Sequence, residues 1–339
     1  MKAAVYHGKE DLRVEEVAEP MVQDDEVKVH VKYCGICGTD IHIFHGDGGS
    51  ADVTPPLVPG HEFSGVVSEV GSKVTRVQVG DRVTVDPNDM CESCYYCRNG
   101  QRHFCENMNG IGTSSDGGFA EYVVTREKQV YKVADSLSFL KAAMTEPLAC
   151  CLHGIDLCNI KSGDNVLVIG GGPIGMIMMQ LAKSEGATKV IMSEPVEEKR
   201  TLALKLGADI AVDPINEDLS AILNKECKNV DVVIECAGLP ATQNQSIKLA
   251  GKGATVMLFG LSAPTDNFPL HSDDVFKKEL KVTSSFINPY TCERALQILE
   301  ADAIEVEELI TDIVPLDNIV DTFVNPEYRR AGKVVIQLS

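Results

Sequence analysis

The sequence predicts two domains of different class: a mostly-β domain and an α/β domain with a doubly wound parallel sheet. Two observations predict this organisation. The chain has 339 residues, which suits two domains of ordinary size. Its hydrophobic pattern also changes near residue 150, from short runs broken by Gly and Pro to apolar strands that alternate with helical segments. We place the mostly-β domain at residues 1–148 and 288–339, and the α/β domain at residues 149–287.

The first part of the chain favours strands and turns over long helices. Alternating apolar and polar residues predict strands at 26–32, 65–70 and 81–85. This region is therefore interpreted as the mostly-β domain. The tail after the α/β region is less regular and ends in a strand-like run at 333–337.

The second part of the chain predicts a parallel sheet, because strands and helices alternate along it. We expect helices at 174–184 and 197–206, and a third around 219–225. The expected strands are at 165–170, 189–193, 210–212, 230–236 and 254–259.

Composition excludes two classes of function. The formal net charge of −19 and the lack of a basic patch argue against a nucleic-acid-binding protein. No apolar run approaches the length of a membrane helix, and the N-terminus shows no signal-peptide pattern. We therefore expect a cytoplasmic protein without membrane contact, in which the 12 cysteines stay reduced.

Four cysteines lie close together in the first domain. Cys91, Cys94, Cys97 and Cys105 have the spacing of a tetrahedral zinc cage. A closed four-sulfur site leaves no position open for a reactant, so this zinc is expected to be structural.

A glycine-rich turn lies at the start of the predicted α/β domain. Gly170, Gly172 and Gly175 fit the G-x-G-x-x-G pattern, with Pro173 and Ile174 between them, after a strand and before a helix. Such a turn lets the backbone approach a pyrophosphate, and the helix N-terminus offers free N–H groups to it. We expect a Rossmann dinucleotide site here; the alternative is a glycine-rich turn without a ligand.

The choice of dinucleotide depends on the end of the second strand of this domain. Glu194 stands there, about 20 residues after the glycines, where a carboxylate accepts hydrogen bonds from the ribose hydroxyls. A carboxylate at this position repels a 2′-phosphate, so NAD is favoured. Lys199 and Arg200 are close in sequence and keep NADP as the alternative.

A second metal site is indicated by residues from distant segments. Cys37, His61 and the carboxylates Glu62 and Glu146 are suitable zinc ligands. Spacing alone does not establish the site, since Cys34 and Cys37 also fit a redox pair or small core residues.

These motifs follow one another in the order used by one family. The chain resembles the zinc-containing alcohol dehydrogenases of the medium-chain superfamily, and among them the sorbitol and other polyol dehydrogenases. The resemblance covers essentially the whole chain. It rests on Cys37-Gly-Thr-Asp40, Gly60-His61-Glu62-x-x-Gly65, the 91–105 cysteines, Asp116-Gly-Gly-Phe-Ala-Glu-Tyr122, Glu146-Pro147 and Gly170–Gly175.

The resemblance implies a fold and a set of zinc ligands. It implies a GroES-like catalytic domain that carries one catalytic and one structural zinc, a Rossmann coenzyme domain, and an active site in the cleft between them. Cys37, His61 and Glu146 would surround the catalytic zinc. Glu62 would orient His61 or replace water on the metal during turnover.

The resemblance also implies the reaction. Zinc would lower the pKa of the alcohol oxygen, and hydride would pass from the alcohol carbon to NAD. The proton would pass from the Thr39 hydroxyl to a ribose hydroxyl of the coenzyme and then to His42. The simpler interpretations are a turn hydroxyl for Thr39 and a surface imidazole for His42.

The expected activity is NAD-linked oxidation of a secondary hydroxyl on a polyol or sugar-derived alcohol, giving a ketone. Animal sorbitol dehydrogenases carry an arginine near the substrate where Ile287 stands here, so sorbitol itself is in doubt. The alternatives are 2,3-butanediol, L-threonine or a sugar-alcohol phosphate and, more remotely, a non-catalytic NAD-binding protein. A homo-oligomer, dimeric or tetrameric like its relatives, is also expected.

Overall fold

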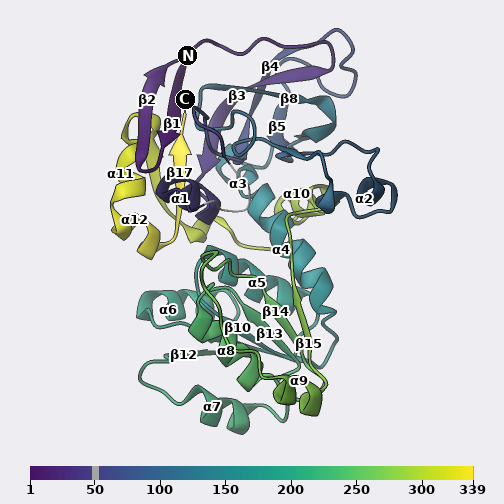
Figure 1. The fold of residues 1–339 in the computed structure, drawn as a ribbon, viewed down its shortest axis with the longest axis vertical. Coiled ribbons are helices and arrows are strands. Elements are labelled where there is room, and N and C mark those ends of the chain that lie inside the picture. The colour runs from purple at the N-terminus through teal and green to yellow at the C-terminus, as the bar shows by residue number, and fades with distance from the viewer. Residues whose placement is uncertain (48–52, 339) are drawn as a thin grey trace. The chain divides into compact units, whose positions relative to one another are not determined.

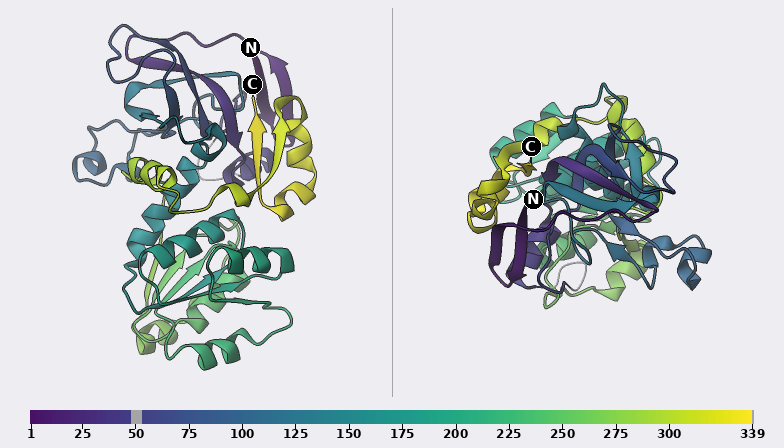
Figure 2. Two further views of the ribbon diagram at one scale, coloured as in Figure 1. Left: turned by 180° about the vertical axis from the view of Figure 1, so that it is seen from behind. Right: turned by 90° about the horizontal axis from the view of Figure 1, so that it is seen from above.

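The computed structural model describes residues 1–47 and 53–338 of the chain. The chain divides into two compact units, of which the first comprises Met1–Ala149 with Pro289–Ser339 and the second Cys150–Asn288. Figures 1 and 2 show that the chain passes from the first unit into the second and returns for its last segment. The first unit is the GroES-like mostly-β domain, and the second is the Rossmann domain.

The first unit is built on a seven-stranded sheet with the order β16-β17-β3-β4-β5-β9, and β8 also pairs with β3. All pairs in it are antiparallel except β16 with β17. The strands are β3 (Glu26–Gly35), β4 (Glu62–Val70), β5 (Arg82–Val85), β8 (Tyr122–Arg126), β9 (Val130–Lys132), β16 (Ile310–Pro315) and β17 (Lys333–Gln337).

Apolar residues at alternate positions of the strands pack one face of this sheet into the hydrophobic core. Val27, Val29 and Val31 of β3 are fully buried and belong to one hydrophobic cluster with Phe63 and Phe119. Successive side chains of a strand point to opposite faces, so the three valines share one face. The strands predicted at 26–32, 65–70, 81–85 and 333–337 are all present, with β3 and β4 longer than predicted.

Shorter elements surround this sheet. Two small antiparallel sheets have two strands each: β1 (Lys2–Gly8) with β2 (Asp11–Glu16), and β6 (Asn88–Asp89) with β7 (Asn109–Gly110). Helices of the N-terminal part are α1 (Gly38–His45), α2 (Tyr95–Arg98) and α3 (Phe139–Ala142).

The tail is more regular than the sequence analysis expected, and that expectation was wrong. Besides β16 and β17, it forms three helices: α10 (Cys292–Glu300), α11 (Ile319–Val324) and α12 (Pro326–Ala331). Buried Ala295, Leu296 and Leu299 lie on one side of α10, which is the spacing of an amphipathic helix. Figure 2 shows α11 and α12 in yellow on the same side of the first unit as β17.

The second unit contains a six-stranded, entirely parallel sheet with the order β12-β11-β10-β13-β14-β15. This order reverses direction between β10 and β13, which is the doubly wound Rossmann arrangement. The strands are β10 (Asn165–Ile169), β11 (Lys189–Ser193), β12 (Ile210–Val212), β13 (Val232–Glu235), β14 (Thr255–Leu258) and β15 (Lys281–Ser284). The predicted α/β class is confirmed, and β15 was not predicted.

Helices connect these strands. The predicted helices correspond to α5 (Pro173–Ser184), α6 (Glu197–Lys205) and α7 (Leu219–Glu226). Three helices were not predicted: α4 (Thr145–Cys158), α8 (Pro240–Leu249) and α9 (Ser272–Lys278). Across residues 1–47 and 53–338, no helix is both long enough and apolar enough to cross a membrane.

Candidate functional site

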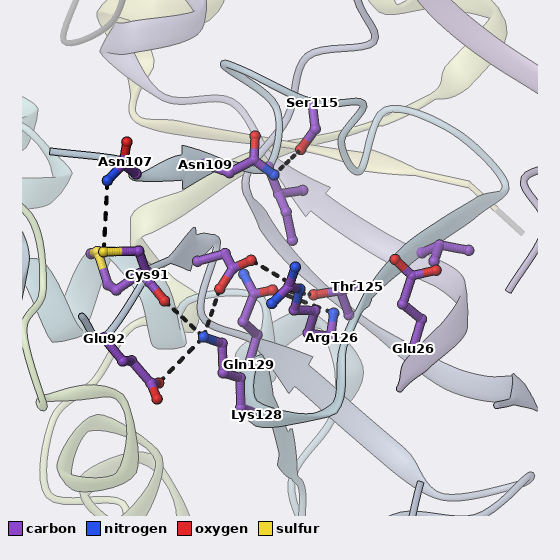
Figure 3. A pocket seen from close by; sticks show the side chains of 14 residues that line it. Glu26, Cys91, Glu92, Asn107, Asn109, Ser115, Thr125, Arg126, Lys128 and Gln129 are labelled. Carbon is purple, nitrogen blue, oxygen red and sulfur yellow. Dashed lines mark hydrogen bonds and ion pairs between the residues drawn. The ribbon is translucent and has the colours of Figure 1, made fainter. Parts of the chain in front are cut away.

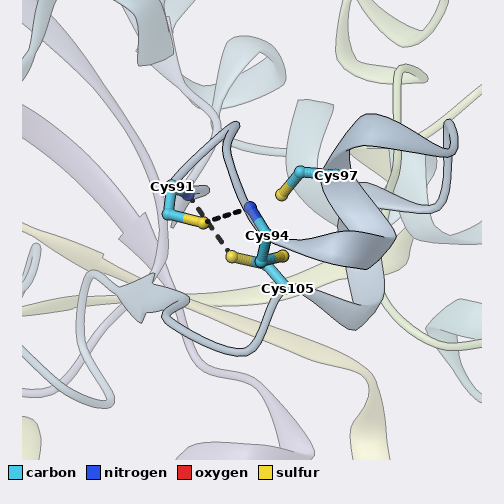
Figure 4. A group of neighbouring side chains, drawn as sticks. All are labelled: Cys91, Cys94, Cys97 and Cys105. Carbon is cyan, nitrogen blue, oxygen red and sulfur yellow. Dashed lines mark hydrogen bonds between the residues drawn. The ribbon is translucent and has the colours of Figure 1, made fainter.

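The four predicted cage cysteines come together in the first unit. The sulfurs of Cys91, Cys94, Cys97 and Cys105 all lie within 4.8 Å of one another (Figure 4). The loop before α2 carries Cys91 and Cys94, α2 itself carries Cys97, and Cys105 follows a short turn. Backbone N–H groups donate to the sulfurs, from Cys94 to Cys91 at 3.4 Å and from Cys91 to Cys105 at 3.3 Å.

The surroundings of these sulfurs suit a divalent cation. Hydrogen bonds from the backbone and hydroxyl of Ser93 lower the pKa of Cys91 to about 5. Burial and the neighbouring Cys105 and Cys94 thiols raise the pKa of Cys97 to about 12. Four adjacent thiols cannot all ionise easily unless a cation compensates their charge. The donor set and its tight packing therefore fit a closed zinc site.

A second cluster joins Cys37, His61 and Glu62, whose ligand atoms also lie within 4.8 Å of one another. Cys37 is the N-cap residue of α1, two residues after the end of β3, and Glu62 is the first residue of β4. Antiparallel pairing places Gly35 opposite Glu62, so the end of one strand meets the start of the other. His61 and Glu62 are buried, with 8% and 1% of their surface exposed.

Asp40 belongs to this cluster, although the sequence analysis gave it no role. One carboxylate oxygen accepts a hydrogen bond from the Cys37 backbone N–H at 2.8 Å. The other lies 3.5 Å from Nδ1 of His61. Burial alone would lower the pKa of His61, but the charges of Asp40 and Cys37 raise it well above its usual value. An imidazole between a carboxylate and a thiol is typical of a metal ligand with its orienting acid.

Lys333 is the second residue that the sequence analysis missed. Its amine forms a buried ion pair with Oε2 of Glu62 and donates to the backbone carbonyl of Ile36 at 2.9 Å. Burial lowers its pKa, but the charges of Glu62, Cys37 and Glu146 more than compensate, so the pKa is raised. The amine is therefore held as a cation beside the candidate metal ligands.

Glu146 lies near this cluster but outside its tightest part. It is in the first turn of α4 and is buried, with 7% of its surface exposed. It is within electrostatic range of Lys333, yet it is not among the residues whose ligand atoms all lie within 4.8 Å of one another. Direct binding of zinc by Glu146 stays a prediction.

Thr39 and His42, the predicted proton relay, both lie on α1 directly after Cys37. They are three residues apart, so they share one side of the helix, and both are half-buried. His45, on the last turn of α1, has Nδ1 3.6 Å from a carboxylate oxygen of Glu10. The relay itself stays a prediction.

The glycine-rich turn joins β10 to α5 in the second unit. Gly172 is the N-cap of α5 and Pro173 its first residue. A Cβ on Gly175 would lie 1.8 Å from the carbonyl oxygen of Gly170, so only glycine fits this close packing. A Cβ on Gly172 would meet no atom within 4 Å, which leaves open space in front of the helix N-terminus. The turn therefore fits a pyrophosphate cradle.

Glu194 follows β11, and its carboxylate is connected to this turn. One oxygen accepts from the Gly171 N–H at 2.6 Å and the other from the Val196 N–H at 2.9 Å. Arg200 donates to the carbonyl oxygens of Glu194 and Pro195 at 2.9 and 2.7 Å. Its guanidinium thus stabilises the turn that carries Glu194.

A large cavity of about 730 Å³ lies elsewhere, beside the four-cysteine loop (Figure 3). The cationic side chains that line it are already in ion pairs. Asp89 pairs with Arg126 at 3.2 Å and with Lys128 at 2.9 Å. Cys91 lines this cavity, but none of the predicted catalytic or coenzyme residues does. We therefore do not assign it to the reaction.

Comparisons with known proteins match both units. Residues 23–135 match the family model for the alcohol dehydrogenase GroES-like domain, and residues 173–301 the model for zinc-binding dehydrogenases. The D-arabitol-phosphate dehydrogenase of Enterococcus avium is 38% identical, over 93% of this chain and 91% of its own length. The chain belongs to the zinc-binding alcohol dehydrogenase family.

Two further members are close to it. The sorbitol dehydrogenase of Halalkalibacterium halodurans is 36% identical over 92% of each chain. A solved structure of a Sinorhizobium meliloti protein, described as a zinc-binding dehydrogenase bound to NADP, is 40% identical with a TM-score of 0.95 over 99% of each chain. This zinc-dependent dehydrogenase is therefore an enzyme, with the fold class that the sequence predicts.

Proposed function

We propose that this zinc-dependent dehydrogenase oxidises a secondary hydroxyl of a polyol or sugar-derived alcohol to a ketone, with NAD as the hydride acceptor. The observation that carries the proposal is the cluster of Cys37, His61 and Glu62 in a chain that also holds an open glycine turn. The arabitol-phosphate and sorbitol activities of the relatives support this substrate class. A non-catalytic NAD-binding protein would not need these buried ligands.

Each residue of the metal centre has a distinct role in this proposal. Cys37 and His61 would hold the zinc, and Glu146 would complete the ligand set directly or through water. Asp40 would fix the orientation of His61, because its carboxylate faces Nδ1. When bound, zinc supplies Lewis-acid chemistry that makes the alcohol proton easier to remove.

Removal of that proton falls to the side chains of α1. The Thr39 hydroxyl would accept the proton from the alcohol and pass its own to a ribose hydroxyl of the coenzyme, from which His42 would take a proton on toward solvent. Their half-buried positions three residues apart on α1 support a relay along one side of the helix. When bound, NAD would supply the acceptor for the hydride, which carries the electron pair of the broken C–H bond.

The coenzyme would be bound by the unit Cys150–Asn288. The pyrophosphate would lie at Gly170, Gly172 and Gly175, with Pro173 and Ile174 in the first turn of α5. The Glu194 carboxylate would accept from the ribose and repel a 2′-phosphate, which favours NAD. Arg200 is engaged with two backbone carbonyls, so it is not positioned as a free phosphate ligand.

A sugar-alcohol phosphate is the second candidate substrate, and one specific observation favours it. The relative that is 38% identical is a D-arabitol-phosphate dehydrogenase. Such a substrate requires basic residues in the pocket, next to its phosphate group. 2,3-Butanediol stays an alternative, because the (R,R)-butanediol dehydrogenase of Bacillus subtilis is 33% identical over 95% of this chain. L-threonine rests on the family resemblance alone.

The test is a comparison of kcat/KM with NAD across arabitol, sorbitol, arabitol phosphate, 2,3-butanediol and threonine. The assays use protein in which both zinc sites have been loaded. We expect the highest kcat/KM for a polyol or its phosphate, and loss of at least about a thousandfold in His61→Ala. Equal, metal-independent rates for all alcohols would contradict the proposal.

Four further expectations complete the proposal. The zinc at Cys91, Cys94, Cys97 and Cys105 would stabilise the first unit without entering the reaction. A small-molecule alcohol is the partner in the reaction, and a homo-oligomer (dimer or tetramer) is proposed from the resemblance. The cytoplasmic location stays a prediction.

A further inference from the structure

The ion pair between Lys333 and Glu62 lies at the edge of the candidate metal centre, and nothing in the proposed reaction uses it. The Glu62 carboxylate belongs to the cluster with Cys37 and His61, and Lys333 contacts the same carboxylate. One acid is thus shared between a potential metal and a fixed cation.

The backbone holds Lys333 at this place. β17 pairs with β3, with Val335 opposite Gly35, and Ile36 N–H donates to the Val334 carbonyl at 2.9 Å. The Lys333 amine in turn donates to the Ile36 carbonyl at 2.9 Å. The cation therefore has a fixed anchor on the segment that leads to Cys37.

Gly35 provides the space for the pair. A Cβ on Gly35 would lie 2.9 Å from Cε of Lys333 and still closer to Oε2 of Glu62. Lys333 and Glu62 are both almost fully buried, with 6% and 1% of their surface exposed. A lysine and a glutamate buried to this degree are rare unless they are paired.

The arrangement has a consequence for the metal. Glu62, if free, would be a strong carboxylate ligand next to Cys37 and His61, and would fill the position that an alcohol needs. A neighbouring ammonium competes for the same oxygens through its charge and hydrogen bonds.

We propose that Lys333 is a positioning residue that holds the Glu62 carboxylate away from permanent metal binding and so keeps one coordination position open for the alcohol. This inference rests on the proposed function, because it assumes a metal at Cys37 and His61. It predicts that loss of the Lys333 charge converts Glu62 into a lasting ligand.

The test uses full-length protein with Co²⁺ in place of zinc. The visible spectrum of the His61→Ala protein is subtracted, which removes the contribution of the four-cysteine site. In Lys333→Gln, which keeps a hydrogen-bonding side chain but no charge, we expect altered cobalt bands and release of cobalt to a chelator slowed roughly tenfold. Lys333→Arg keeps the charge and is expected to behave like wild type.

A double variant identifies the responsible group. In Lys333→Gln/Glu62→Gln the cobalt bands and the release rate should return toward wild type, because the added ligand is removed. The matched control is Lys28→Gln: Lys28 is another buried lysine, paired with Glu19 at 2.9 Å and Glu69 at 2.7 Å, and it contacts no candidate metal ligand. This variant should leave the bands unchanged.

The outcomes separate this inference from the proposed function. If wild-type protein shows no cobalt signal that depends on His61, the proposed metal centre fails. If that signal is present but Lys333→Gln has the same bands and release rate, the inference about Lys333 alone is overturned. It is also overturned if Lys333→Gln does not fold while Lys333→Arg does, because the pair then serves stability.

Discussion

The Asp40 carboxylate lies 3.5 Å from Nδ1 of His61 while its other oxygen accepts the Cys37 N–H at 2.8 Å. One acid thus connects two candidate metal ligands from different segments, Cys37 at the N-cap of α1 and His61 just before β4. Asp40 has 1% of its surface exposed, so water does not weaken these contacts. The connection explains how Cys37, which follows β3, and His61, which precedes β4, keep a common orientation.

We expect Asp40→Asn to bind zinc about 10- to 100-fold more weakly at this centre, because the amide orients His61 less well. The measurement is competition for zinc with a chromophoric chelator. Zinc at the four-cysteine cage and zinc at the Cys37–His61 centre are distinguished by their different rates of release to the chelator. If zinc at the Cys37–His61 centre leaves Asp40→Asn at the wild-type rate, Asp40 does not orient His61 for metal binding.

Cys94→Ser is expected to lose the zinc of the four-cysteine site and to lower Tm by about 4–8 °C. Metal analysis should show one zinc fewer per chain. NAD binding should persist, since the glycine turn belongs to the other unit. The control is Cys227→Ser, which changes a buried cysteine outside the cluster. If Cys94→Ser keeps the same zinc content as wild type, the four-cysteine cage is not a metal site.

Glu194→Ser is expected to reduce the preference for NAD over NADP by about tenfold or more, because the repulsion of a 2′-phosphate is removed. The variant also removes the acceptor of the Gly171 N–H, so affinity for NAD should fall as well. Kd values for both coenzymes give the ratio. Glu197, an exposed acid at the start of α6, provides the control variant Glu197→Ser. If the ratio of the Kd values for NADP and NAD changes equally in Glu194→Ser and Glu197→Ser, Glu194 does not determine the coenzyme preference.

Asp81 provides a pH-dependent contribution to stability. A hydrogen bond from Lys132 at 2.7 Å and another from the Gln78 N–H at 2.9 Å lower its pKa below 3.8. A depressed folded-state pKa means that this stabilisation is present above pH 4 and is lost as pH falls through the folded value. We expect Asp81→Asn to lower the free energy of unfolding by about 1 kcal/mol at pH 7 and by much less at pH 3. Denaturant titrations at the two pH values check this; an equal loss at both would exclude the charge as the cause.

Much of the Rossmann unit could be predicted from sequence because its signals are local. The apolar runs in the sequence coincide with β10, β11 and β12, and the glycines mark the turn before α5. Helices α8 and α9 were missed because polar residues dominate them and few of their side chains are buried. α10 was missed although its apolar residues have helical spacing.

The site could be predicted in part. The cysteine cage and the Cys37–His61–Glu62 group carry recognisable residue types. Asp40 could have been found, since it stands three residues after Cys37 in the position of a capping acid. Lys333 could not, because it reaches Ile36 across 297 residues, and nothing near it in sequence indicates a metal centre.

Transfer of deuterium tests the central claim most directly. An arabitol or sorbitol labelled at its secondary carbinol carbons is oxidised with NAD by zinc-loaded wild type and by Cys37→Ser. We predict one deuterium in the reduced nicotinamide for each ketone formed by wild type, and neither product from Cys37→Ser. Ketone without deuterium in the coenzyme, or equal transfer by Cys37→Ser, would contradict a zinc-dependent hydride transfer at this centre.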